Sequence, residues 1–124
     1  MTRKQGRFYF AALARSHVRM YSGAVKLLQR EGFDCRCIDL DDVFFLKTAK
    51  PAFADEGLSS ISLVDADAQL EAGDILVVAN DWVPAPLVQL LNGRRQRGID
   101  AVGCIDGCRF AKDNNYRNVD HVLG

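Results

Sequence analysis

The chain has 124 residues, of which 48% are hydrophobic, and its 16 basic and 16 acidic side chains give a formal net charge of zero. This length suits one domain with an ordinary core, and a zero net charge provides no overall field that would attract nucleic acid. No apolar run approaches the roughly 20 residues that a membrane span needs, although contact with a membrane surface is compatible with the sequence.

The first third of the chain predicts a strand, a helix and a second strand. Arg7 to Leu13 (RFYFAAL) is apolar on both faces, as expected for a central parallel strand that helices cover on both sides. Apolar residues recur at helical spacing from Val18 to Arg30, with Ser16 as the candidate N-cap and Gly32 as the stop. Phe33 to Leu40 alternates apolar and polar residues and predicts the second strand.

The middle of the chain carries the weakest pattern. Asp41 to Ser60 contains proline and glycine without a clear period, so we expect it to be irregular. Ser62 to Glu71 predicts a short helix that Asp65 begins and Gly73 closes.

The last part predicts further strands around one helix. Ile75 to Asn80 is a buried strand, and the helix that follows runs from Pro84 to about Gln96 with Gly98 as its terminator. Ala101 to Ile105 and His121 to Leu123 predict two more strands. Strands that alternate with amphipathic helices predict an α/β fold, a three-layer, doubly wound, Rossmann-like parallel sheet with strand order 3-2-1-4-5.

Polar residues follow three of the predicted strands, and in an open parallel sheet such residues meet at one edge. The corners comprise Arg15, Ser16 and His17 after the strand at 7–13, Asn80, Asp81 and Trp82 at the end of the strand at 75–80, and Asp106, Gly107 and Arg109 after the strand at 101–105. The first corner lacks the glycines that let a backbone approach a pyrophosphate, and no Walker-type loop occurs. We therefore expect no cofactor such as NAD or ATP in this domain.

Several of these side chains have more than one interpretation. Near a helix N-terminus His17 is a neutral general base, or it caps the helix or meets solvent. Asp81 orients His17, binds a sugar hydroxyl or caps the next helix. Trp82 stacks on a sugar ring or base, or covers the core.

The residues after the strand at 101–105 also have more than one interpretation. Asp106 and Gly107 form a tight turn or contact a ligand, and Arg109 meets an anionic substrate or solvent. The four cysteines lie in or beside apolar runs, which predicts reduced thiols in a cytosolic chain. Their two pairs are three strand spacings apart, about 14 Å, so no four-cysteine zinc site is expected.

Longer stretches of the chain resemble a known family. "RFYFAALARSHVRMYSGAVKLLQREGFDCRCIDLDD", "GDILVVANDW", "RRQRGIDAVGCIDG" and "YRNVDHVLG" together resemble the N-terminal Rossmann-like half of GT-B fold glycosyltransferases of surface-polysaccharide synthesis. Phe44 to Leu70 matches poorly. Ser16 stands where the family has the glycine of a Gly-His corner, and Ala79 stands where it has the first glycine of "GNDW".

The resemblance implies the N-terminal half of a longer, cytoplasmic two-domain enzyme that transfers sugar from a nucleotide-sugar to a glycan or lipid-linked acceptor. The acceptor would meet Ser16, Arg19 and the other two corners, and His17 or Asp81 would deprotonate its hydroxyl. The nucleotide-sugar would be bound mainly by a C-terminal domain outside this sequence. Two alternatives stay open, namely half of a nucleotide-sugar 2-epimerase-like enzyme and a stand-alone Rossmann-like binding module.

Overall fold

The computed structural model describes residues 6–79, 84–104 and 120–123. Its strands are β1 (Phe8–Ala12), β2 (Cys35–Asp39), β3 (Ser60–Ile61), β4 (Ile75–Ala79), β5 (Asp100–Cys104) and β6 (His121–Leu123). Its helices are α1 (Arg15–Arg30), α2 (Ala49–Asp55), α3 (Leu63–Gln69), α4 (Ala85–Asn92) and the 3₁₀ turn η1 (Arg95–Arg97).

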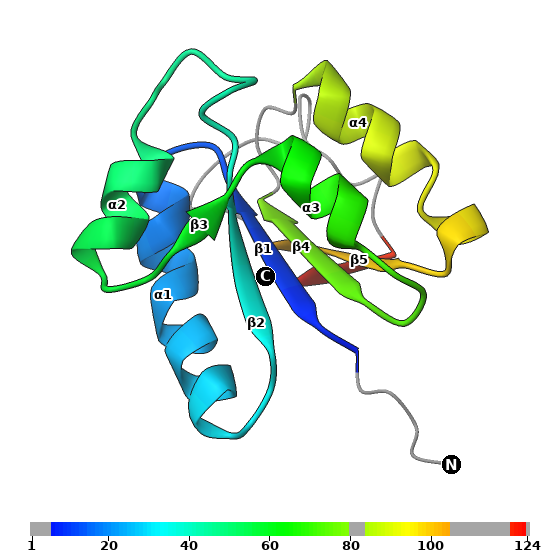
Figure 1. The fold of residues 1–124 in the computed structure, drawn as a ribbon, viewed down its shortest axis with the longest axis horizontal. Helices are drawn as coiled ribbons and strands as arrows, with labels where there is room; N and C mark the ends of the chain where they lie inside the picture. Colours follow the sequence, from blue (N-terminus) through cyan, green and yellow to red (C-terminus); the bar gives the residue numbers. More distant parts are fainter. Residues whose placement is uncertain (1–5, 80–83, 105–119, 124) are drawn as a thin grey trace.

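The strands form one parallel sheet with the order β3-β2-β1-β4-β5-β6. This confirms the predicted doubly wound α/β fold and the order 3-2-1-4-5, to which β6 adds a strand beside β5. The chain crosses from β1 outward to β3 and then returns to the other side of β1, as Figure 1 shows. Helix α1, which follows β1, and helix α4, which follows β4, therefore cover opposite faces of the sheet. Such sheets bind ligands at the edge where two neighbouring strands of this kind end.

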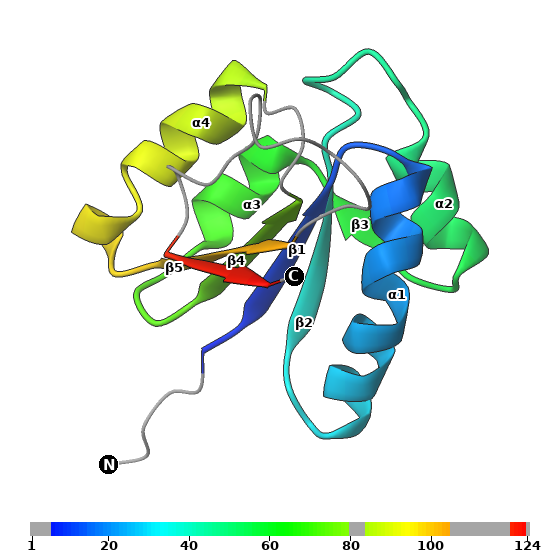
Figure 2. The same cartoon turned by 180° about the vertical axis from the view of Figure 1, so that it is seen from behind.

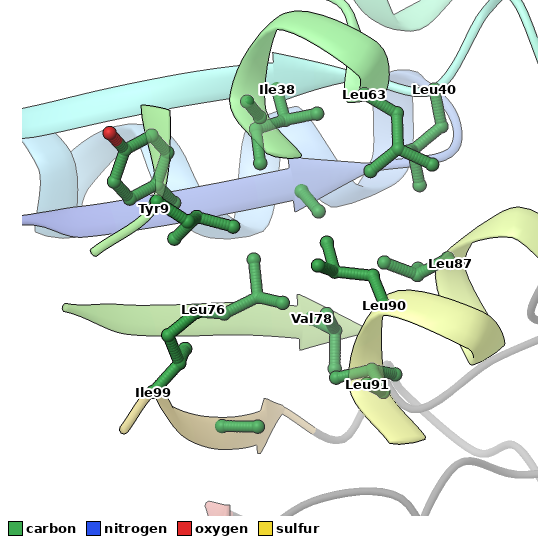
Figure 3. Close-up of a cluster of buried hydrophobic side chains, with 14 of the residues drawn as sticks. Tyr9, Ile38, Leu40, Leu63, Leu76, Val78, Leu87, Leu90, Leu91 and Ile99 are labelled. Carbon is green, nitrogen blue, oxygen red and sulfur yellow. The ribbon is translucent and has the colours of Figure 1, made fainter. Parts of the chain in front are cut away.

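Two separate cores lie on the two faces of the sheet. Tyr9 and Ala11 belong to the core under α3 and α4, whereas Phe10 and Ala12 belong to the core under α1 and α2. The alternation follows from the period of two along a strand. Figures 1 and 2 show the two helix layers on opposite faces, and Figure 3 shows the first core, in which leucines of α3 and α4 meet the apolar side chains of the central strands.

Helix α1 begins three residues earlier than the periodicity predicts. Its N-cap is Ala14, which has no side chain to offer the helix, and Ser16 lies inside the first turn, so the prediction of Ser16 as N-cap is wrong. The apolar period cannot locate this start because Arg15 and Ser16 are exposed and carry no packing signal. The predicted end is confirmed, since Gly32 follows the helix with a φ of 91°.

The segment expected to be irregular, 41–60, contains helix α2 and the first residue of β3. The carboxylate of Asp41 accepts hydrogen bonds from the backbone N–H groups of Ala49 and Lys50, at 3.1 Å each. Pro51 is the third residue of this helix, where a missing N–H leaves no intrahelical bond unmade. The prediction of an irregular segment is wrong here because the residue that caps α2 lies eight residues before the helix, and the local sequence pattern does not indicate such a cap.

The other boundaries shift by a few residues. Helix α3 begins after Ser62, whose hydroxyl accepts the Asp65 N–H at 3.2 Å, so Ser62 and not Asp65 starts it. Helix α4 ends at Asn92 rather than near Gln96, and the chain continues through η1 to Gly98, which has a φ of 73°.

The amino edge of the sheet is closed by a buried ion pair. Asp74 is 1% exposed and accepts hydrogen bonds from the Arg7 backbone N–H at 3.0 Å, the Arg7 guanidinium at 3.1 Å and the Glu71 N–H at 2.8 Å. Gly6 lies so close to this turn that an added Cβ would be 2.1 Å from the Gly73 carbonyl oxygen. The amino edge of the sheet is therefore closely packed around Asp74.

Candidate functional site

The carboxyl ends of four strands lie at one edge of the sheet. Ala12 at the end of β1 is the register partner of Asp39, and Ala79 at the end of β4 is the partner of Cys104. Because β1 and β4 also pair in parallel, the chain leaves all four strands on the same side. The convergence predicted from the sequence is present in the described strand ends.

The corner between β1 and α1 is the described part of the predicted site. Ala14 is extended, with φ −157° and ψ 174°, and turns the chain into α1. The first N–H of the helix, from Arg15, donates to the Thr48 hydroxyl at 3.1 Å. A side chain from the β2–α2 connection therefore supplies the cap that the local sequence lacks.

His17 is 1% exposed, and its Nδ1 accepts the Leu13 backbone N–H at 3.1 Å. An imidazole nitrogen that accepts a hydrogen bond carries no proton, so the ring is neutral with its proton on Nε2. In this state Nε2 is a hydrogen-bond donor. The ring is buried and its Nδ1 holds the β1–α1 turn, and a role of His17 as a general base stays a prediction.

Ser16 and Arg19 differ from His17 in exposure. Both are exposed on the first turns of α1, at the end of the helix that faces the carboxyl edge. They are the two predicted substrate-binding residues that the structure describes.

The remaining predicted site residues lie outside the described residues. They are Asn80, Asp81 and Trp82 after β4, and Asp106, Gly107 and Arg109 after β5. The structure describes the strand residues that precede them, Ala79 and Cys104, and places those two side by side at the edge.

Two further carboxylates, which the sequence did not single out as site residues, lie at this edge. Asp39 is 6% exposed and accepts the Ser60 hydroxyl at 2.7 Å, and Asp41 is 9% exposed and caps α2. An acidic residue at the last position of a parallel strand was the signal available in the sequence, since that position faces the ligand edge of an open sheet. Their partners show that each one orders a neighbouring segment.

Two surface hollows that are lined by described residues lie away from this corner. One of about 370 Å³ is a groove between α3 and α4, with Leu63 and Leu90 on its walls and Asp67 and Arg97 beside them. Another of about 410 Å³ lies beside the amino half of β2, with Cys35 in its lining.

The described cysteines show no feature of a reactive or metal-binding thiol. Cys35, Cys37 and Cys104 are free thiols. Burial raises the pKa of Cys37 to about 12, with the neighbouring Cys35 adding to the shift, and burial also raises the pKa of Cys104. Among the residues that the structure describes, no group of three side chains could hold a metal ion.

Comparisons with protein-family models, with curated proteins and with solved structures find no match to this chain. Within the described ranges, no helix is both long enough and apolar enough to cross a membrane.

Proposed function

We propose that this chain is the acceptor-side half of a GT-B type glycosyltransferase that works in the synthesis of a cell-surface glycan. The observation that carries the proposal is the common edge formed by the ends of β1, β4 and β5, with Ser16 and Arg19 exposed beside it. The family resemblance of the segments that flank this edge supplies the reaction class.

The shape of the β1–α1 corner favours an acceptor over a nucleotide. Leu13 and Ala14 form the turn, and the first N–H group of the helix behind it, that of Arg15, already donates to the Thr48 hydroxyl. A pyrophosphate needs glycine at such a turn and free N–H groups at the helix end. A sugar hydroxyl or a single anionic group can instead be held by exposed side chains such as those of Ser16 and Arg19.

The hydrogen bond of His17 leads us to propose a positioning role for His17 and the role of general base for Asp81. Because Nδ1 accepts the Leu13 N–H, the imidazole positions the β1–α1 turn and presents a donor at Nε2. Asp81 is then the proposed general base, which takes the proton of the acceptor hydroxyl as this oxygen attacks the anomeric carbon of the nucleotide-sugar. The nucleotide diphosphate leaves with its electron pair, and a second domain would bind it.

The test is a titration of the isotope-labelled chain, followed by NMR, with an alkyl-linked N-acetylhexosamine that lacks a diphosphate as acceptor and with a UDP-sugar. We expect the acceptor to shift the amide signals of Ser16 and Arg19, whereas the UDP-sugar leaves them in place. Arg19→Ala should weaken acceptor binding about tenfold, because it removes a charge-assisted contact.

Arg30→Ala is the matched control, since Arg30 is exposed at the other end of α1, about 16 Å along the helix from Arg19. It should bind like the parent chain. Tighter binding of the UDP-sugar than of the acceptor at this edge would contradict the proposal. So would sugar transfer by the 124 residues alone.

A further inference from the structure

Two consecutive apolar side chains are exposed in the connection between β2 and α2. Phe45 is 67% exposed and Leu46 is 43% exposed. Phe44 precedes them, is half-buried, packs against the core under α3 and α4, and lies with its ring centroid 4.5 Å from that of Phe45. Figure 1 shows this connection rising from the carboxyl edge of the sheet, above the ends of α1 and α2.

Hydrogen bonds hold both ends of this connection. The carboxylate of Asp41 accepts the N–H groups of Ala49 and Lys50, and the Lys47 ammonium donates to the Asp41 carbonyl oxygen. These hydrogen bonds join the two ends of segment 41–50. Phe45 and Leu46 are presented on an ordered support, so little conformational entropy is lost when they contact a partner.

Among the described residues of segment 41–50 and of the adjoining start of α1, the exposed charges are mainly basic. Lys47 and Lys50 are exposed, and Arg15, whose N–H donates to Thr48, is exposed at the adjoining start of α1. Asp42 is the one exposed acid in segment 41–50, because Asp41 is buried and used as a cap. The chain as a whole has no net charge, so this local positive charge is a property of the surface around Phe45 and Leu46.

We propose that this surface, defined by Phe45 and Leu46 together with Arg15, Lys47 and Lys50, docks on an anionic lipid bilayer. An aromatic ring and a leucine can enter the boundary between headgroups and acyl chains while the ammonium and guanidinium groups stay at the headgroups. Basic side chains close to a negatively charged leaflet add to this attraction.

The size of the surface favours a bilayer over a protein partner. A stable protein interface buries about 800 Å² on each side, far more than two side chains on a loop supply. A bilayer adapts its shape to a small protrusion and needs only a few apolar and basic side chains for reversible binding. The inference depends on exposed side chains alone and stands apart from the proposed glycosyl transfer, which other residues and another assay test.

The test is co-sedimentation of the chain with vesicles of equal parts phosphatidylglycerol and phosphatidylcholine, compared with vesicles of phosphatidylcholine alone. We expect binding to the anionic vesicles that weakens as salt is added. The double variant Phe45→Ser/Leu46→Ser should bind at least tenfold more weakly, and Lys50→Glu at least fivefold more weakly. Circular dichroism verifies that both variants keep the fold.

Leu27→Ser is the matched control, because Leu27 is 51% exposed near the far end of α1. It should sediment with the vesicles like the parent chain. Absence of binding to anionic vesicles at millimolar lipid overturns the proposal, as does a double variant that binds like the parent. Analytical ultracentrifugation adds a third overturning outcome: a dimer without lipid that the double variant dissociates would make this surface an interface between copies of the chain.

Discussion

At the scale of single residues, buried polar side chains hold the turns of this protein by accepting backbone N–H groups. His17 accepts from Leu13, Asp41 from Ala49 and Lys50, and Asp74 from Arg7 and Glu71. Asp120 accepts from Ala101 at 2.9 Å. A buried N–H without a partner costs about 1–3 kcal/mol, so each of these side chains decides the path of the chain nearby.

Asp120 has the clearest electrostatic role of these residues. It accepts two hydrogen bonds of 3.0 Å from the Arg94 guanidinium, which is 6% exposed. These bonds, followed by the N–H of Ala101 and the charges of Arg94 and Arg95, lower its pKa from 3.8 to about 2 against the opposing effect of burial. The pair fixes the start of β6 against β5 and the end of α4.

We expect Asp120→Asn to lower the free energy of unfolding at pH 7 by about 2 kcal/mol, since each unit of pKa shift corresponds to about 1.4 kcal/mol. The folded-state pKa lies below the unfolded one, so the stabilisation is complete above about pH 5 and is lost as the pH falls through 4 to 2. Urea unfolding of both chains at pH 7 and pH 3 measures the difference, which should shrink at the lower pH.

Asp100→Asn serves as the control for that experiment, because Asp100 is an exposed carboxylate at the start of β5. It should change stability by less than about 0.5 kcal/mol at either pH. A difference for Asp120→Asn that stays the same at pH 7 and pH 3 would show that the charge of Asp120 is not the source of its effect.

At the scale of elements, α1 is the longest helix of the described residues and the one whose face is clearest from the sequence. Val18, Tyr21 and Val25 are buried at helical spacing against β1 and α2. Gly23 lies on the opposite, exposed face, and an added Cβ there would meet nothing within 4 Å. Gly32 also has open space around it, but its φ of 91° belongs to the left-handed region.

The two glycines should respond in opposite ways to the same substitution. Gly23→Ala should raise the free energy of unfolding by about 0.5–1 kcal/mol, because alanine loses less backbone entropy in a helix. Gly32→Ala should lower it by about 1 kcal/mol, since a side chain at positive φ is strained. Urea denaturation of the two variants measures both effects. Stabilisation by Gly32→Ala would mean that α1 ends differently in solution.

At the scale of the whole molecule, the two-faced parallel sheet places its interior strands beyond the reach of solvent. Cys37 is 3% exposed on β2, with Phe10 and Ser60 as its register partners on the two neighbouring strands. Cys35 lies two residues earlier on the same face and is half-buried. Burial raises the pKa of both thiols, to about 12 for Cys37.

Cys37 should therefore report on global unfolding. We expect its alkylation by iodoacetamide at pH 8 to be at least about a thousandfold slower in the native chain than in urea, since only a globally opened state exposes it. Cys35 should react sooner. Trypsin cuts after Arg36 and puts the two thiols on separate peptides, which mass spectrometry quantifies. Equal rates for both thiols in the native chain would indicate that β2 opens locally.

Some features of the candidate site follow from the local sequence, whereas others depend on contacts between distant segments. Ser16 and His17 could be identified from the sequence as the first corner, because an apolar strand and an amphipathic helix bracket them. Three features could not be predicted from the local sequence, namely the burial of His17, the Thr48 cap on α1 and the Asp41 cap on α2. Each depends on segments that come together only when the chain folds. The catalytic roles of His17 and Asp81 and the ligand contacts of the other corners stay predictions.

The sequence alone determined the fold class, because burial on both faces of parallel strands and on one face of each helix imposes apolar periods that can be read residue by residue. It therefore predicted the order of the first five strands and most of the helices. Only the tertiary structure decided how α1 and α2 begin and which residues reach the surface at the carboxyl edge. Those features come from hydrogen bonds between segments up to 33 residues apart, such as Arg15 and Thr48, and no local pattern encodes such a pairing.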